Sequence, residues 1–379
     1  MSNRSFFFAG GGTGGHIYPA IAVAEKIIEI QPNAKIHFFV SDRDIDSQIL
    51  SKSNFPHTKL SAKGFSLRPG RLVEFCRCFS KSKWVAKQVM VARPQAESEA
   101  AVVVGVGGFV AAPVCWAAHK LKIPFVLLNV DSVPGRANKI IARWADEIFV
   151  QFQETSEYFA KCKAAVNVVG CPLRGGFENP EPDKVKNDLG LDKNKRILLI
   201  AGGSSGAANI NEAVCLLLER LAGFASDWQI VHLAGVSNYD KVKQRYAGAK
   251  ISHKVLDYFD DMASLLAAAD LVIGRSGGTS VAEYAAASVP SICMPYPYHK
   301  DMHQYRNAGK LVDAGAGIIV DDLPDTKERA DWLWEELELL LKDEKKRQKM
   351  QKACATIANR DAAVKIAERL IKKANSVQI

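Results

Sequence analysis

The stretch SFFFAGGGTGGHIYPAIAVAEKIIEI at residues 5–30 decides the fold. It begins with a short apolar run, continues with five glycines in six positions, and ends with Ile21, Ala24, Ile27 and Ile28 on one helical face. The stretch therefore predicts a strand, a glycine-rich loop and a helix in succession. Strands that alternate with helices in this way form parallel sheets that carry helices on both faces.

The same alternation continues along the chain in two series. Apolar runs lie at 34–41, 100–108, 124–130 and 147–151 in the first series, and at 196–203, 228–235, 269–278 and 289–297 in the second. Between the series, segment 170–190 is rich in proline, glycine and charge, which is typical of a linker. We predict an α/β protein with two Rossmann-like domains, at residues 1–172 and 173–355.

The chain from Thr326 onward is predicted to be helical. Residues 329–357 carry Trp332, Leu333, Leu337, Leu340 and Leu341 at helical spacing, which predicts a packed amphipathic helix. Another helix is predicted at 361–375, within a C-terminal segment 356–379.

Composition limits the classes of protein. The chain has 379 residues, 48% of them hydrophobic, and 50 basic against 41 acidic side chains give a net charge of +9, which favours anionic ligands. Its eight cysteines form no CxxC pair, which argues against a zinc ribbon or a dithiol motif. No apolar stretch reaches about 18 residues, so we expect neither an export signal nor a spanning helix. The charge is spread without an aromatic-basic RNA signature, which disfavours nucleic-acid binding.

Four glycine clusters follow apolar runs, at 10–15, 104–109, 202–206 and 274–278. In a doubly wound sheet such loops gather at the carboxyl edge of the strands, where ligands bind. Glycine lets backbone N–H groups approach a phosphate, and a helix N-terminus adds positive potential, so the clusters predict a diphosphate ligand. For the first cluster taken alone, a tight turn without a ligand is the alternative.

Two side chains near these loops are candidate proton acceptors. His16 closes the first loop, and Asp131 follows the run at 124–130. A structural hydrogen bond is the alternative role for His16, and capping of a turn is the alternative for Asp131. The acidic stretch DRDID at 42–46 contains a DxD pattern that some nucleotide-sugar enzymes use for a divalent ion, but a polar turn is the more common outcome.

Residues 71–94 mix bulky apolar residues with cations. Leu72, Phe75, Phe79 and Trp84 alternate with arginines and lysines, which suits a helix that lies on an anionic lipid surface. A core helix with one solvated face is the alternative.

Seven motifs resemble one family in order and spacing. They are GGGTGGHIYPAIAVA at 10–24, GVGGFVAAP at 105–113, SVPGRANK at 132–139, VVGCPLR at 168–174, GGSSGAANIN at 202–211, DDMASLLAAADLVIGRSGGTSVAEYAAASVP at 260–290 and PYHKDMHQYRNAG at 297–309. The chain resembles the MurG family of peptidoglycan N-acetylglucosaminyltransferases from residue 6 to about residue 320. The resemblance implies a GT-B fold, with two Rossmann-like domains facing across a cleft and the segment 356–379 crossing back to the first domain.

The resemblance also implies an activity. Members transfer N-acetylglucosamine from UDP-GlcNAc to the 4-hydroxyl of the muramoyl sugar of undecaprenyl-linked lipid I, with inversion, and release lipid II and UDP. They work as peripheral proteins on the cytoplasmic face of the cell membrane, and the resemblance implies no cofactor. The alternatives are another GT-B transferase with a UDP-sugar and a different lipid or glycoside acceptor, a non-hydrolysing epimerase, or a nucleotide-sugar sensor.

Residue roles follow from motif position. The resemblance places the acceptor on Thr13, Gly14, Gly15, Gly107, Gly108 and Phe109, with His16 or Asp131 as the base. It places UDP-GlcNAc on Arg174, Ser204, Ser205, Tyr258, Phe259, Arg275, Gly277, Gly278, Thr279, Glu283, His303 and Gln304. Leu72, Phe75, Phe79 and Trp84 would form the membrane patch.

The chain departs from the family pattern at four points. Asn129-Val130-Asp131 stands where members have EQN, and Phe109 replaces a tyrosine. Ser205 replaces a glutamine, and His303 replaces the first residue of a Gln-Gln pair. The first two departures bear on the acceptor and on the base.

Overall fold

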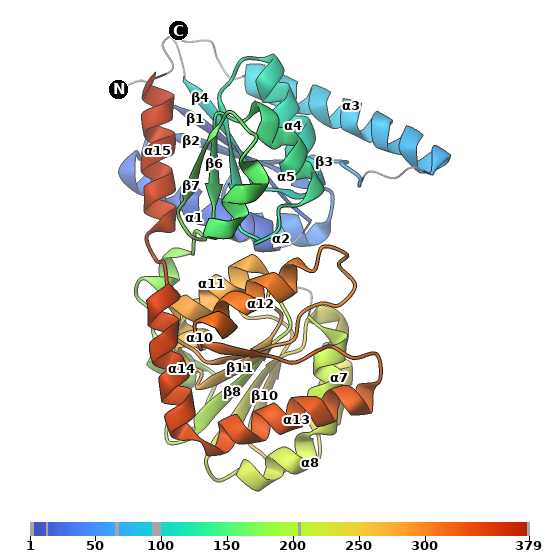
Figure 1. Cartoon of the computed structure of the whole chain (residues 1–379), viewed down its shortest axis with the longest axis vertical. Coiled ribbons are helices and arrows are strands. Elements are labelled where there is room, and N and C mark those ends of the chain that lie inside the picture. Colours follow the sequence, from blue (N-terminus) through green and yellow to red (C-terminus); the bar gives the residue numbers. More distant parts are fainter. Residues whose placement is uncertain (1–3, 13, 65–67, 93–99, 204–205, 377–379) are drawn as a thin grey trace. The chain divides into compact units, whose positions relative to one another are not determined.

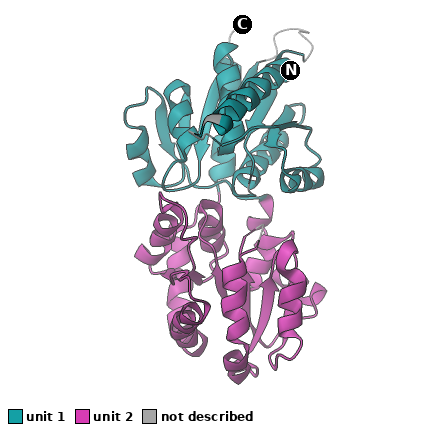
Figure 2. Cartoon of the chain, turned by 90° about the vertical axis from the view of Figure 1, so that its right-hand side faces the viewer, with its two compact units in different colours: residues 1–174, 361–379 teal, residues 175–360 magenta. Residues whose placement is uncertain are grey.

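A computed structural model of the chain describes residues 4–12, 14–64, 68–92, 100–203 and 206–376. The chain divides into two compact units (Figure 2). Unit 1 comprises residues 1–174 and 361–379, and unit 2 comprises residues 175–360. Each unit has its own parallel sheet and its own core.

Unit 1 is built on a seven-stranded sheet in the order β3-β2-β1-β4-β5-β6-β7. Most of its strands are labelled in Figure 1. The strands are β1 Ser5–Ala9, β2 Lys35–Ser41, β3 His57–Leu60, β4 Ala101–Gly105, β5 Phe125–Asn129, β6 Glu147–Val150 and β7 Ala165–Val168. All neighbouring strands are parallel, and the pairing sets Ala9 opposite Gly105 at the carboxyl ends of β1 and β4.

Helices cover this sheet. They are α1 Gly14–Ile30, α2 Asp44–Ser53, α3 Pro69–Val91, α4 Gly108–Lys120, α5 Arg136–Ile141 and α15 Ala362–Ser376, with 3-10 turns η1 Ala142–Trp144 and η2 Gln153–Phe159. Helix α15 packs against α1, and its apolar face is buried through Ile366, Leu370 and Ile371. The segment 361–379 thus completes the unit that the first 174 residues begin.

Unit 2 repeats the plan with six parallel strands in the order β10-β9-β8-β11-β12-β13. The strands are β8 Arg196–Ala201, β9 Trp228–Leu233, β10 His253–Leu256, β11 Leu271–Gly274, β12 Ser291–Cys293 and β13 Gly317–Ile319. The helices are α6 Pro182–Asp188, α7 Ala208–Leu216, α8 Leu218–Leu221, α9 Tyr239–Tyr246, α10 Met262–Ala268, α11 Gly278–Ala286, α12 His303–Asp313, α13 Thr326–Lys342 and α14 Glu344–Ile357, with 3-10 turns η3 Gly175–Phe177, η4 Ala222–Phe224 and η5 Val236–Asn238. The predicted α/β class, with two parallel sheets, is confirmed.

The prediction of one helix over 329–357 is wrong. The chain forms two helices there, because Asp343 ends α13 with an extended backbone and starts α14 by accepting a hydrogen bond from the Lys346 N–H at 2.8 Å. Such an N-cap satisfies a backbone donor that the first turn of a helix leaves open. The apolar side of α13 is buried in unit 2 through Leu333, Leu337 and Leu340, as its spacing predicts.

A buried polar triad joins α7, β9 and α9 in unit 2. The His232 ring lies between the Tyr246 hydroxyl, 2.9 Å from Nδ1, and the Asn211 side-chain oxygen, 3.0 Å from Nε2. Asn211 donates in turn to the Ala234 carbonyl at 2.8 Å, so its oxygen faces His232 and requires a proton on Nε2. Burial lowers the pKa of His232 from 6.5 to about 3 and keeps the ring neutral.

We expect acid to destabilise unit 2 through His232. Because its folded pKa lies below its unfolded pKa, the unfolded state binds the extra proton as the pH falls from about 6.5 towards 3. Lowering the pH from 7 to 5 should cost about 2 kcal/mol at this site. His232→Gln, which cannot titrate, should lose this part of the pH dependence in hydrogen-exchange protection of β9. An equal slope in both proteins would contradict the expectation.

Candidate functional site

The strand order of each sheet reverses direction at one point, and the predicted loops meet there. In unit 1 the reversal lies between β1 and β4, which lead into the glycine clusters 10–15 and 104–109. In unit 2 it lies between β8 and β11, which lead into clusters 202–206 and 274–278. Open α/β sheets bind ligands at such points. Each unit therefore carries one pair of loops at the position where a ligand is expected.

The first loop of unit 1 is held by a buried carboxylate. Asp46, on the first turn of α2, is fully buried and accepts hydrogen bonds from the Gly12 N–H at 2.8 Å and from the Ser41 N–H at 3.1 Å. The Ser41 hydroxyl donates to the same oxygen. A Cβ on Gly11 would stand 2.5 Å from this carboxylate, so the position requires glycine. The missing side chain of Gly11 thus makes room for a carboxylate of the protein itself, that of Asp46.

Arg43 holds the same peptide from the other side. Its Nη1 donates to the Gly12 carbonyl at 2.7 Å, so both polar groups of Gly12 are bonded to the DRDID segment. Gly108 touches this loop, because a Cβ there would stand 2.6 Å from the Gly11 carbonyl oxygen, and its φ of +75° also favours glycine. The two glycine loops of unit 1 therefore interlock.

His16 lies where these loops meet. Its ring packs on Gly107, where a Cβ would stand 2.9 Å from Cδ2 and Nε2. The Asn138 amide lies beside Gly107 as well and donates to the Asn129 side-chain oxygen at 3.0 Å. Asn129 in turn donates to the Asp131 carbonyl at 2.6 Å. The structure thus connects the surroundings of His16 to the loop that carries Asp131.

Other predicted acceptor residues lie around this point. Gly14 and Gly15 begin α1, Gly107 and Gly108 begin α4, and Phe109 is 55% exposed beside them. Thr13 lies outside the described residues. Among the residues that the structure describes, no group of three or more His, Cys, Asp or Glu side chains is arranged to hold a metal ion.

In unit 2 the residues after β11 form the start of α11. Gly277 caps the helix, Gly278 and Thr279 form its first turn, and Glu283 follows on its second turn. The buried Ser276 hydroxyl donates to the Gln304 carbonyl at 2.9 Å, and the Asn307 side chain donates to the Ser276 carbonyl at 3.0 Å. These bonds tie the start of α11 to α12.

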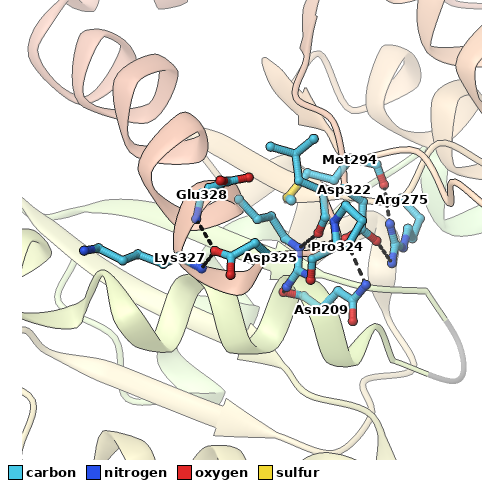
Figure 3. A network of polar contacts seen from close by, with 10 residues as sticks. Asn209, Arg275, Met294, Asp322, Pro324, Asp325, Lys327 and Glu328 are labelled. Atoms are coloured by element: carbon cyan, nitrogen blue, oxygen red, sulfur yellow. Dashed lines mark hydrogen bonds and ion pairs between the residues drawn. The ribbon is translucent and has the colours of Figure 1, made fainter.

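Arg275 belongs to a buried charged network, shown in Figure 3. Its guanidinium is 2.8 Å from the buried carboxylate of Asp322 and donates to the Met294 carbonyl at 2.8 Å. Asp322 is also 2.8 Å from Arg329 of α13 and accepts from the Asn209 side chain at 2.9 Å. Two arginines thus share one carboxylate, and the three groups carry a net charge of +1 next to the first turn of α7, which contains Asn209.

His303 and Gln304 open α12. The His303 ring stacks on His299 with centroids 4.4 Å apart, and its Nδ1 is 2.7 Å from the Asp301 carboxylate. Burial acts to raise the pKa of Asp301, but the hydrogen bond and charge of His303 outweigh it, so the pKa is lowered. The Gln304 side-chain oxygen accepts from the Tyr296 N–H at 2.9 Å. Both side chains are therefore held in place by their own loop.

The other residues that were predicted to bind UDP-GlcNAc do not all lie together. Tyr258 and Phe259 follow the carboxyl end of β10, whereas Ser204 and Ser205 lie outside the described residues. Arg174 belongs to unit 1, where its guanidinium lies 4.2 Å from the centre of the Tyr18 ring on α1. Its assignment to UDP stays a prediction.

Helix α3 divides into two parts. Ser82, Ala86 and Met90 are buried, and Ala86 and Met90 belong to the unit 1 core, whereas none of the described side chains at 70–81 is buried. Phe75 and Phe79 pack on each other on the side that continues the buried stripe. Trp84, nine residues after Phe75, points from the opposite side of the helix and is 62% exposed. The four residues of the predicted patch therefore do not share one face.

No helix among the described residues is long and apolar enough to cross a membrane.

Sequence reasoning missed the residues that hold the loops. The sequence indicated Asp46 only as part of a DxD pattern, and Arg43 only as another residue of the DRDID stretch. Asp322 and Arg329 lie outside every quoted motif, and the structure alone brings them to Arg275 and Asn209. A buried carboxylate leaves no periodic signal in a sequence.

Comparison with known proteins gives two family matches. Residues 6–150 match the N-terminal domain of glycosyltransferase family 28, and residues 197–370 match its C-terminal domain. A protein of Acetivibrio thermocellus is 33% identical over 365 residues, covering 95% of each chain, and is named UDP-N-acetylglucosamine--N-acetylmuramyl-(pentapeptide) pyrophosphoryl-undecaprenol N-acetylglucosamine transferase.

Solved structures share the fold. The crystal structure of MurG from Acinetobacter baumannii is 25% identical, with a TM-score of 0.67 over 97% of this chain and 99% of that chain. A UDP-N-acetylglucosamine 2-epimerase from Listeria monocytogenes, described as putative, has a TM-score of 0.72 at 14% identity over 100% of this chain and 98% of that one, a likeness of fold alone. The GT-B fold is confirmed.

We expect Asp46→Asn to loosen the first loop of unit 1. The amide NH2 of asparagine would face donors that now point to a carboxylate, and a lost hydrogen bond to a charged group costs about 1.5–3 kcal/mol. Hydrogen exchange should quicken at Gly12 and Ser41. Asp44→Asn, at an exposed carboxylate two residues away, is the matched control and should change stability by about 0.5 kcal/mol or less. Equal effects of the two changes would refute the role of Asp46.

Asp322→Asn should destabilise unit 2 by about 3–5 kcal/mol. It leaves Arg275 and Arg329 buried without their shared anion, and breaking a buried pair from one side has this cost. Hydrogen exchange of the α13 amides, recorded during thermal unfolding, would measure this loss of stability. The control Asp331→Asn removes an exposed pair with Arg220 and should cost at most about 1 kcal/mol. A loss below 1 kcal/mol for Asp322→Asn would show that the network contributes little.

Proposed function

This chain belongs to glycosyltransferase family 28, and we propose that it transfers N-acetylglucosamine from UDP-GlcNAc to the muramoyl sugar of lipid I, giving lipid II and UDP in peptidoglycan synthesis. The observation that carries this function is the 33% identity, over 95% of both chains, to a transferase named for that reaction. The paired loops in each unit support it, because donor and acceptor each contain a diphosphate.

We assign the donor to unit 2. The N-terminus of α11 and the net positive Arg275–Asp322–Arg329 network favour an anion beside Gly277, Gly278 and Thr279. Glu283 would accept hydrogen bonds from the ribose hydroxyls, and Tyr258 and Phe259 would lie against uracil. His303 and Gln304 would contact the GlcNAc. Arg275 would then offset the charge that develops on the departing UDP.

We assign the acceptor to unit 1 and the base to His16. In the reaction, the acceptor 4-hydroxyl oxygen bonds to the anomeric carbon while the bond from that carbon to UDP breaks on the opposite face. UDP leaves with the electron pair, and the hydroxyl proton passes to His16. The support for His16 is its place between the two interlocked loops, at the reversal of strand order. Asp131 would orient the hydroxyl.

We propose that the protein works as a peripheral protein on the cytoplasmic face of the cell membrane. The N-terminal half of α3 supports this, because Leu72, Phe75 and Phe79 lie there without burial in the core and cations flank them. Anionic lipid would attract these cations.

The decisive measurement of function is mass spectrometry of the products from UDP-GlcNAc with a lipid I analogue and with simpler glycosides. A gain of one GlcNAc on the lipid I analogue alone is expected. Transfer to a simple glycoside but not to the lipid I analogue would point instead to another transferase of the same fold. No transfer to either acceptor would refute the proposal.

We expect His16→Ala to lower kcat by about 100-fold or more, since a general base contributes about 10²–10⁴. The variant should also lose the acid limb of the kcat profile against pH, because no imidazole remains to titrate. Asp131→Asn should lower kcat but keep that limb. If Asp131→Asn removes the limb and His16→Ala keeps it, the two roles are reversed.

A further inference from the structure

A pocket of about 270 Å³ opens beside the first loop of unit 1. Its walls come from the carboxyl ends of β1 and β2, from the segment after β3, and from the start of α4. Two cations, Arg43 and Lys63, and one carboxylate, Asp42, line it. All three side chains are exposed, and the lining has a net charge of +1.

Two backbone donors of the neighbouring glycine loop are already bonded within the protein. The Gly10 N–H donates to the Phe39 carbonyl at 3.1 Å, and the Gly12 N–H donates to Asp46. The buried charge of Asp46 also opposes a second anion at these peptides. An anionic group at this end of the loop therefore needs donors other than the N–H groups of Gly10 and Gly12, and the cations of the pocket lie next to these two residues.

Arg43 is oriented for this role. Its hydrogen bond to the Gly12 carbonyl fixes the guanidinium against the loop and uses one of the five N–H groups that an arginine carries. A planar guanidinium is well suited to phosphate oxygens. The Phe109 ring also lines the pocket and packs against Gly64, where a Cβ would meet a ring carbon at 2.9 Å.

Lys63 connects the pocket to the proposed membrane helix. Its ammonium pairs with Glu74 on the N-terminal part of α3, beside Phe75. The anionic group in the pocket should therefore be the one joined directly to the lipid. In the acceptor that group is the diphosphate, whereas the carboxylates of the peptide lie beyond the sugar.

From this juxtaposition we infer that Arg43 and Lys63 bind the diphosphate of the lipid-linked acceptor in the pocket beside Gly12, in place of the N–H groups of Gly10 and Gly12. The inference rests on the proposed function for the identity of the acceptor. It adds a subsite to unit 1 that depends on side-chain charge, with Phe109 as the apolar wall for the group attached to the diphosphate.

Farnesyl diphosphate, which carries a diphosphate on a short prenyl chain and no sugar, is the probe. Its affinity for the full chain is measured by calorimetry in Lys63→Met, Arg43→Met, Arg43→Lys and Asp42→Asn. Lys63→Met keeps the side-chain stem at an exposed position, so it removes charge with little effect on the fold. Arg43→Lys keeps the charge, and Asp42→Asn removes the opposing carboxylate as the matched control.

We expect Lys63→Met and Arg43→Met each to weaken binding about tenfold, Arg43→Lys to recover part of the loss, and Asp42→Asn to tighten binding. The KM for a lipid I analogue should rise by a similar factor in the two methionine variants, while the KM for UDP-GlcNAc stays within twofold. High salt should narrow the difference between the variants and the parent.

Three outcomes overturn the subsite: no binding of farnesyl diphosphate by the parent protein, unchanged affinity in both methionine variants, or an equal loss for UDP-GlcNAc. If the affinities change as expected but the parent transfers nothing to the lipid I analogue, the subsite stands and the proposed function fails. If transfer occurs but the KM for the lipid I analogue is the same in both methionine variants as in the parent, the proposed function stands and the subsite fails.

Discussion

Each unit places a buried carboxylate behind its ligand loops, and much of the local structure depends on these two anions. Asp46 binds the peptide of Gly12, and Asp322 binds Asn209 and two arginines. Neither carboxylate lies on a strand of its sheet; each lies in a segment that the fold brings to the loop. A glycine-rich loop by itself has many backbone conformations, and a fixed charge with several donors selects one of them.

The two units use their carboxylates in different ways. Asp46 accepts from the backbone N–H groups of Gly12 and Ser41, and the nearby cations Arg43 and Lys63 lie on side chains around the loop. Asp322 accepts from cationic side chains and leaves one excess positive charge beside α11. The same strand order therefore supports two electrostatic arrangements. Under the proposed function, this difference would let the protein distinguish the diphosphates of donor and acceptor, although both would bind at the same kind of sheet edge.

The sequence predicts the centre of each sheet better than its edges. Every strand that the apolar runs indicated lies inside a sheet, whereas β3, β7, β10 and β13 escaped prediction, and all four are edge strands. Central parallel strands are buried on both faces and read as continuous apolar runs, whereas edge strands such as HTKL and HKVL are partly exposed. Motifs placed the glycine loops and the starts of α1, α4 and α11. The partners of Arg275 could not be predicted, because Asp322 and Arg329 reach it only through the folded chain.

Helix α15 has a consequence for how the chain folds during synthesis. Unit 1 begins at the N-terminus, but the face of α1 against which α15 packs stays uncovered until residues 362–376 leave the ribosome. Unit 2 is continuous from 175 to 360 and can close before that moment. Unit 2 can therefore be complete before unit 1, although synthesis of unit 1 begins first. During this time the apolar face of α1 stays uncovered. Such a delay exposes unit 1 to chaperones and to aggregation until α15 packs on α1.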